Sequence, residues 1–141
     1  MAQDASASRT AIVVEDDADD RSLVTTLLEE SEFSIVECES GEAALAAMRI
    51  RGSDVALVFA DQRLAGCMDG VDLACEVKRH WPQLTMVLSS EPADRRIDDL
   101  PDDIVVLRKP WLALDVLIIA ERARSTARDQ LRPRSGAPGP G

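Results

Sequence analysis

The sequence lacks the features that mark several common classes of protein. It has only three cysteines, Cys38, Cys67 and Cys75, and neither a CxxC motif nor a Cys/His ligand spacing. We therefore expect reduced thiols in or near the core. No apolar run approaches the ~18 residues of a membrane span, and residues 1–10 lack the basic and apolar regions of a signal peptide. These absences predict a cytoplasmic protein without membrane contact.

Positive charge is also scarce over most of the chain. The formal net charge is -10 at pH 7. Residues 1–120 hold 11 basic and 24 acidic side chains, which is net -13, whereas residues 121–141 hold five arginines and two acids, which is net +3. An acidic body argues against nucleic acid as a direct partner, and the arginine-bearing end is too weak a feature to reverse that.

The apolar segments indicate the fold class. A chain of 141 residues is the size of one domain, and it can bury roughly two thirds of its unfolded surface. Five short segments rich in Val, Ile and Leu alternate with amphipathic segments, as in a parallel sheet that is covered on both faces. We predict an α/β protein with a doubly wound, five-stranded parallel sheet. The predicted strands are 10–14, 33–37, 55–60, 84–89 and 104–107.

The segments between these strands predict about five helices. Leu23, Leu27 and Leu28 have helical spacing and are expected to face the core, with Arg21 facing outward. Ser40 is the expected cap of the second helix, before a run of strong helix formers. The expected helices are 18–31, 41–50 before Gly52, 71–80, a short or irregular fourth helix within 91–103, and 111 to about 128.

The ends of the chain differ in composition from its body. The segment "RPRSGAPGPG" is rich in Pro and Gly and cannot build a packed core. We therefore predict a flexible N-terminus at 1–8, one domain at 9–128 and a disordered tail at 129–141.

Polar residues follow the predicted strands at the edge where function is expected. In an open parallel sheet, the functional crevice lies beyond the carboxyl ends of the strands. Glu15 and Asp16 follow the first strand, Asp61 follows the third, Ser89 ends the fourth and Lys109 lies just beyond the fifth. These side chains should converge at one edge.

The acidic segment "EDDADD" divides into two groups. Residues 17–20 are expected to occupy the start of a helix, where the macrodipole favours negative charge. Glu15 and Asp16 lie at the strand end and should face Asp61. Clustered carboxylates either raise one another's pKa or bind a cation, and oxygen-only ligands suit Mg²⁺. An EF-hand is excluded because Arg21 occupies the position that must be glycine.

Asp61 is a candidate nucleophile towards a phosphoryl group. A carboxylate held beside a divalent cation can play this role because the metal neutralises the developing charge. Lys109, one of two lysines against fourteen arginines, would add a compact second positive charge. Ser89 would donate to a phosphoryl oxygen. The alternatives are a helix-capping Asp61, a surface Lys109 and a core hydroxyl at Ser89.

These motifs resemble a bacterial response-regulator receiver domain over roughly residues 9–128. The motifs are "IVVEDD" with Glu15 and Asp16, "LVFADQRLAGCMDG" with Asp61, "VLSS" with Ser89 and "LRKP" with Lys109. The resemblance implies a flavodoxin-like fold with strand order 2-1-3-4-5. It also implies a single-domain response regulator in a two-component system or phosphorelay.

The resemblance implies a chemistry for the site. Mg²⁺ would be bound by Asp16, Asp61 and the backbone carbonyl of Arg63, with Glu15 acting largely through water. A sensor histidine kinase or histidine phosphotransfer protein would donate a phosphoryl group to Asp61, where Ser89 and Lys109 would hold its oxygens. Water would then hydrolyse the aspartyl phosphate. The protein would therefore not be an enzyme.

The sequence departs from the usual receiver pattern in several places. Val106 stands where such domains commonly have Phe or Tyr. The sequence therefore leaves open whether the domain switches without that aromatic residue. Ala65 replaces a frequent Pro, and one extra residue precedes Asp69, so the loop after Asp61 is expected to differ in shape. Two further positions, Arg63 and Glu91, are candidates for tuning the phosphoryl lifetime.

The C-terminal part of the sequence gives expectations about output and about packing near the last helix. No DNA-binding or catalytic domain follows in the sequence, so output is expected through contact with an unidentified downstream protein. Residues 116–119, "VLII", exceed what one helix face buries, which indicates a homodimer or partner surface, with core burial as the alternative. Pro110 should fix its loop and could be cis. Trp111 is expected to pack in the core or at the helix start.

Two other functions remain as alternatives. A haloacid-dehalogenase-like small phosphatase also uses an Asp nucleophile, a strand-end Ser and a Lys, but its acidic pair follows the Lys. Here that pair, Asp102 and Asp103, precedes Lys109, and no cap domain is present. A receiver-like scaffold that binds partners without phosphorylation is the second alternative, and the intact set of site residues argues against it.

Overall fold

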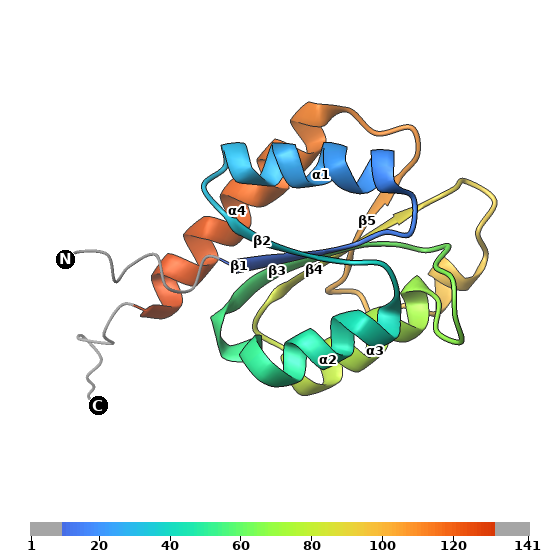
Figure 1. Cartoon of the computed structure of the whole chain (residues 1–141), viewed down its shortest axis with the longest axis horizontal. Coiled ribbons are helices and arrows are strands. Elements are labelled where there is room, and N and C mark those ends of the chain that lie inside the picture. The colour runs from blue at the N-terminus through green and yellow to red at the C-terminus, as the bar shows by residue number, and fades with distance from the viewer. Residues whose placement is uncertain (1–9, 132–141) are drawn as a thin grey trace.

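A parallel sheet of five strands lies between two layers of helices in the computed structural model, which describes residues 10–131 and the side chains of residues 10–127 (Figure 1). The strand order is β2-β1-β3-β4-β5, which confirms the expected order. Every strand boundary falls within one residue of its prediction. The strands are β1 (Thr10–Val14), β2 (Ser34–Cys38), β3 (Val55–Asp61), β4 (Thr85–Ser90) and β5 (Val105–Arg108).

The described residues form four α-helices, and the expected fourth helix is a single 3₁₀ turn between β4 and β5. The last helix continues to residue 131, the last residue described, and thus beyond the expected end at about residue 128. The expectations for residues 1–8 and 132–141 lie outside the described residues. The helices are α1 (Ala18–Glu30), α2 (Gly41–Arg51), α3 (Gly70–His80) and α4 (Ala113–Leu131), with 3₁₀ turns η2 (Gly52–Asp54) and η3 (Arg96–Asp99).

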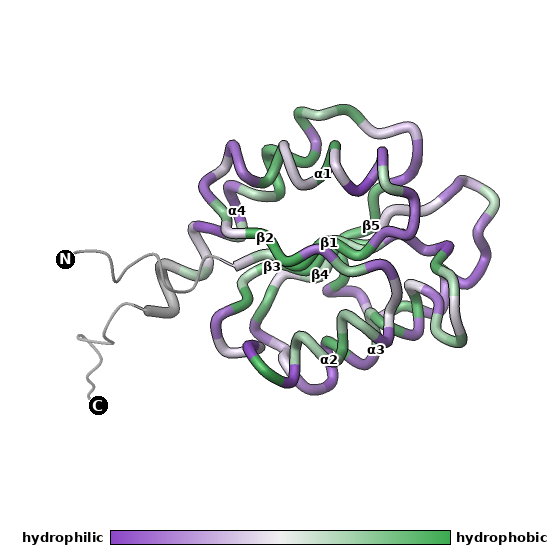
Figure 2. The backbone as a smooth tube through the Cα atoms, viewed as in Figure 1, coloured by the Kyte–Doolittle hydropathy of each residue, from purple (hydrophilic) through white to green (hydrophobic). Residues whose placement is uncertain are grey.

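The two faces of the sheet are covered by different helix pairs. α1 and α4 lie on one face, and α2 and α3 lie on the other (Figure 1). All residues of β1 and β3 are buried, whereas β2 and β5 at the edges are partly exposed. The apolar residues of the central strands accordingly lie between the helix layers (Figure 2). The sheet therefore ends in a rigid, buried edge from which the polar side chains project.

Local capping explains where the helices begin. The carboxylate of Asp17 accepts hydrogen bonds from the backbone N–H groups of Asp19 and Asp20, at 2.9 and 3.0 Å, and so starts α1. The hydroxyl of Ser40 accepts one from Ala43 at 3.1 Å, as predicted for α2. These side chains satisfy backbone donors that have no partner inside the helix.

Two expectations about burial need correction. Leu23 is 51% exposed, because α1 turns Val24 rather than Leu23 towards the sheet together with Leu27 and Leu28. Cys67 is exposed in the loop after β3, although Cys38 is buried. In α4 the run 116–119 is only partly buried, as expected, since Val116 lies in the core and Ile118 is 45% exposed. None of the helices between residues 10 and 131 combines the length and apolar character needed to cross a membrane.

Candidate functional site

Asp61 is held at the end of the most deeply buried strand. Asp61 is only 5% exposed, and it pairs with Ser89 where β3 runs beside β4. The backbone N–H of Gln62 continues this pairing by donating to the carbonyl of Ser89 at 2.8 Å. A Cβ atom on Gly70 would lie 2.5 Å from the backbone oxygen of Asp61, so only glycine allows α3 to begin this close to the strand.

The Asp61 carboxylate has one cation and one backbone donor beside it. Oδ1 lies 2.7 Å from Nζ of Lys109, and Oδ2 accepts a hydrogen bond from the backbone N–H of Arg63 at 3.0 Å. Burial nevertheless raises the pKa of Asp61, against the lowering effect of Lys109, and the charge of Asp16 raises it further. Lys109 therefore offsets only part of the cost of ionising this buried carboxyl group.

Glu15 adds a second buried carboxyl group to the same edge. It is 9% exposed, and its pKa is raised to about 7, chiefly by burial, although the backbone N–H of Asp17 donates to it at 3.2 Å and acts in the opposite direction. Repulsion from Asp61 and a hydrogen bond with Asp16 contribute to the same upward shift. Asp16 itself is exposed. The structure thus brings the three predicted carboxylates close enough to perturb one another.

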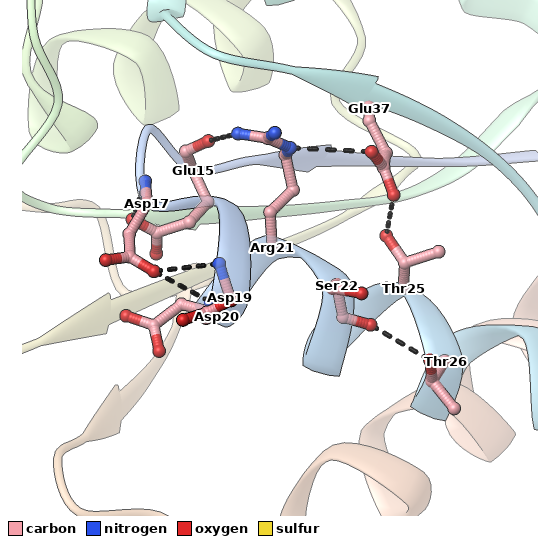
Figure 3. Close-up of polar contacts among 9 residues, drawn as sticks. All are labelled: Glu15, Asp17, Asp19, Asp20, Arg21, Ser22, Thr25, Thr26 and Glu37. Carbon is pink, nitrogen blue, oxygen red and sulfur yellow. Dashed lines mark hydrogen bonds and ion pairs between the residues drawn. The ribbon is translucent and has the colours of Figure 1, made fainter.

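The second part of the acidic segment lies at the start of α1, as predicted (Figure 3). Asp17 caps α1 through the backbone N–H groups of Asp19 and Asp20, and Asp20 also lines the pocket beside Glu15. Arg21, which was predicted to face outward, instead folds back over the end of β1. Its Nη1 donates to the carbonyl oxygen of Glu15 at 2.8 Å, and its Nε lies 3.4 Å from Glu37 of β2 (Figure 3). Arg21 therefore holds the strand end in place without neutralising the Glu15 carboxyl group.

Lys109 reaches the site from the segment that follows β5. Its backbone N–H donates to the carbonyl of Ser90 at 2.8 Å, and the Lys109–Pro110 peptide bond is cis, which the sequence left open. Burial lowers the pKa of Lys109, but Asp61, Glu15 and Glu91 outweigh it, and the net shift is upward. Lys109 therefore remains a cation in the site.

Ser89 has a partner that the sequence did not reveal. Ser89 is only 2% exposed, and its Oγ accepts a hydrogen bond from Nε1 of Trp111 at 2.9 Å. The Trp111 ring also packs edge-on against Phe59, with ring centroids 5.8 Å apart and an angle of 75° between the planes. The packing was predicted, but the hydrogen bond was not. An indole N–H two residues after Lys109 was the only feature in the sequence that could have suggested it.

The two predicted rate-tuning residues contact the site in different ways. A carboxylate oxygen of Glu91 is 3.7 Å from Nζ of Lys109. The side chain of Arg63 is exposed, and only its backbone contacts the Asp61 carboxylate. A pocket of about 370 Å³ opens beside these groups and is lined by Glu15, Asp20, Leu23, Val24, Phe59, Ser89, Glu91, Lys109, Pro110 and Trp111.

The donor set suits a hard cation that keeps some of its water. Within the described part of the chain, no three side chains of His, Cys, Asp or Glu are arranged to hold a metal ion. Mg²⁺, however, is usually bound by one or two carboxylates together with carbonyl oxygens and water. Burial chiefly raises the pKa values of Glu15 and Asp61, and repulsion between neighbouring carboxylates adds to it. A bound cation would offset both effects by stabilising the ionised forms.

The loop after Asp61 is tied to α3 by a polar network. The side chain of Gln62 donates to Asp69 at 3.1 Å and accepts from the backbone N–H of Val71 at 2.8 Å. Asp69 caps α3 in a reciprocal capping box with Asp72, and Arg96 of η3 lies 2.7 Å from Asp69. Gln62 and Arg96 were not singled out from the sequence, because their roles depend on contacts between distant segments.

Residues 11–100 match the family model described as the response regulator receiver domain, which is more than half of the chain. The chain belongs to this family. Receiver domains are signalling modules of two-component systems and are generally not classed as enzymes. Lys109 lies beyond the matched residues, so its link to the site rests on its contact with Asp61.

Sequence and structural similarity to known proteins supports this membership. The nitrogen assimilation regulatory protein NtrX of Azorhizobium caulinodans is 31% identical over 123 residues, which cover 83% of this chain and 26% of that protein. This chain thus spans about a quarter of the length of that curated relative. The crystal structure of the receiver domain of NtrX from Brucella abortus is 30% identical with a TM-score of 0.70, covering 82% of this chain and 98% of that one.

A more distant structure supports the fold alone. The response regulator receiver domain protein from Clostridium thermocellum has a TM-score of 0.75 and 21% identity, covering 86% of this chain and 97% of that one. Both crystal structures are of receiver domains.

Proposed function

We propose that this receiver domain takes a phosphoryl group onto Asp61 from a phosphohistidine on a sensor histidine kinase or histidine phosphotransfer protein. The observation that carries the proposal is the buried Asp61 carboxylate, 2.7 Å from the only lysine at this edge among the described residues. A carboxylate oxygen attacks phosphorus as the bond to the histidine nitrogen breaks, and the product is an aspartyl phosphate.

The surrounding residues have distinct roles in this step. Lys109 stabilises the charge on the phosphoryl oxygens, and Ser89 donates a hydrogen bond to one of them. Mg²⁺ would be held by Asp16, Asp61 and the backbone carbonyl of Arg63, with Glu15 acting through water, and when bound it supplies further neutralisation of negative charge. Water then hydrolyses the acyl phosphate and restores Asp61.

Residues beside the phosphoryl position control how long the signal lasts. Glu91 lies close to Lys109, and the side chain of Arg63 extends from the loop next to Asp61. We assign both residues to tuning the access of water. Phosphorylation then alters protein contacts, for which the exposed apolar side chains at the start of α4 are a candidate surface for a downstream protein or a second copy. They are Leu112, Leu114 and Ile118.

The decisive test is phosphorylation by acetyl phosphate with and without Mg²⁺, followed by intact mass. We expect a gain of one phosphoryl group that requires Mg²⁺ and is absent in Asp61→Asn. Asp102→Asn, which changes an exposed carboxylate in the loop before β5, serves as the matched control and should be labelled normally.

The same assay separates the alternatives. A wild-type protein that gains no mass and binds no Mg²⁺ would support the scaffold interpretation. Repeated turnover of small phosphate esters would support a phosphatase, although membership of the receiver family favours a stoichiometric acceptor. Labelling that persists in Asp61→Asn would place the acceptor elsewhere.

A further inference from the structure

Trp111 lies where it can influence Ser89 directly. The segment that follows β5 carries Lys109 and Trp111 two residues apart, and their side chains reach different parts of the same site. Nζ of Lys109 is 2.7 Å from Asp61, and Nε1 of Trp111 is 2.9 Å from Oγ of Ser89. The edge-on contact with Phe59 fixes the indole ring from the side of β3.

The direction of the hydrogen bond between Trp111 and Ser89 is fixed by chemistry. An indole N–H can only donate, whereas a serine hydroxyl has one proton and two lone pairs. Ser89 must therefore accept from Trp111, and its single proton is directed elsewhere. The carbonyl of Ser89 is already bound by the N–H of Gln62, so the backbone of Ser89 is held in register with Asp61.

We propose that Trp111 is a positioning residue for phosphoryl binding, because its N–H occupies the Ser89 oxygen and reserves the Ser89 proton for a phosphoryl oxygen on Asp61. The inference rests on the proposed phosphorylation of Asp61. Without the indole donor, the hydroxyl would rotate among several orientations, and only some of them would aim the proton at the phosphoryl group. The segment 109–111 thus supplies a cation directly and orients a neutral donor through Ser89.

The neighbouring serine provides a matched control. Ser90 is 1% exposed, and its hydroxyl has no hydrogen-bond partner among the described residues. Because adjacent residues of a strand point to opposite faces, Ser90 does not share the environment of Ser89. Ser90→Ala removes a buried hydroxyl from the same strand without touching Trp111.

The test measures the rate of phosphorylation by acetyl phosphate in Mg²⁺ for wild type, Trp111→Phe, Ser89→Ala, the double variant and Ser90→Ala. Phenylalanine keeps an aromatic ring against Phe59 but removes the N–H. We expect Trp111→Phe to slow phosphorylation about fivefold, the effect of losing one positioned hydrogen bond. In the Ser89→Ala background the same change should have no effect, and Ser90→Ala should match wild type.

Any other outcome would overturn the inference that Trp111 positions the Ser89 hydroxyl. An unchanged rate in Trp111→Phe would show that the indole N–H does not position Ser89. An equal loss with and without the Ser89 hydroxyl would assign Trp111 a packing role only. A wild-type protein that is not phosphorylated would overturn the proposed function, and this inference with it, whereas a phosphorylated wild type with an unaffected Trp111→Phe overturns the inference alone.

A second measurement does not depend on Trp111→Phe folding. The chain has two tryptophans, Trp81 and Trp111, so two indole N–H signals are expected in a nitrogen-proton correlation spectrum. Ser89→Ala should shift the Trp111 signal and speed its exchange with water, and leave Trp81 unchanged. An unmoved Trp111 signal would overturn the hydrogen bond itself.

Discussion

Two aspartates near the end of β3 illustrate opposite uses of a carboxylate. Asp61 and Asp69 each lie next to one cation, Lys109 and Arg96 respectively, and both cation-carboxylate distances are 2.7 Å. Burial raises the pKa of Asp61 despite Lys109. Burial also acts to raise the pKa of Asp69, but hydrogen bonds from Asp72, Arg96 and Gln62 outweigh it, and that pKa is lowered.

The two aspartates differ in burial, since the side chain of Asp61 is 6% exposed and that of Asp69 is 28% exposed, and they also differ in their other neighbours. Asp69 accepts hydrogen bonds from a backbone N–H, a side-chain amide and a guanidinium, so its charge is satisfied. Asp61 has the carboxyl groups of Glu15 and Asp16 nearby, and these oppose its charge. Asp69 therefore stabilises the fold, whereas Asp61 holds negative charge at some cost to stability, as is common at functional sites.

The largest effect is expected from removing the cation beside Asp61. Lys109→Met keeps the length of the side chain but leaves Asp61 without its nearest positive charge, and we expect phosphorylation by acetyl phosphate to slow about a hundredfold or more. Lys78→Met is the matched control, because Nζ of Lys78 donates to the carbonyls of Pro82 and Leu84, away from the site. Comparable slowing in both variants would refute a specific role for Lys109.

The next largest effect is expected from removing the carboxylate of Asp69, whose charge is satisfied by hydrogen bonds. Asp69→Ala removes the cap of α3, leaves the Gln62 side-chain amide without its acceptor and leaves Arg96 with Asp72 alone, so we expect a loss of about 2 kcal/mol in the free energy of unfolding. Urea denaturation measures it, with Asp102→Ala as an exposed control. Because the folded pKa of Asp69 is lowered, the loss should be full above the unfolded pKa of about 4 and shrink as the pH falls. A pH-independent loss would contradict this account.

A smaller effect of opposite sign is expected at Glu15. Its folded pKa of about 7 lies above the ordinary value of 4.5 for a glutamate, so the folded state binds more protons between these values and stability falls as the pH rises through them. Glu15→Gln removes this fall. In chelator-treated buffer at pH 8 the variant should be more stable than wild type by about 1 kcal/mol, with no difference near pH 4. Parallel pH profiles for the two proteins would disprove it.

Much of the candidate site could be predicted from the sequence, because apolar runs indicate where strands end. We found Glu15, Asp61, Ser89 and Lys109 as polar residues at or just beyond the end of a predicted strand, and parallel strands bring their carboxyl ends to one edge. The fold class and strand order followed from the same alternation and from the resemblance to receiver domains.

What the sequence did not reveal depends on contacts between segments that no local pattern links. Trp111 reaches Ser89 across 22 positions, and Arg96 reaches Asp69 across 27. Leu23 was misplaced because a helix with several adjacent apolar residues permits more than one buried face, and packing against the sheet selected Val24. The periodicity of α1 alone could not decide between them.

The smallest effect is expected at Arg96, which completes the environment of Asp69 from η3. Its guanidinium contacts Asp69 and Asp72, but it is solvent-exposed, so water and salt screen much of the attraction. Arg96→Gln should therefore destabilise the fold less than Asp69→Ala, and the loss should shrink in high salt. Its effect should vanish in the Asp69→Ala, Asp72→Ala background, because no carboxylate partner remains. A loss as large as that of Asp69→Ala would mean that Arg96, rather than the cap of α3, holds η3 and the loop after Asp61 together.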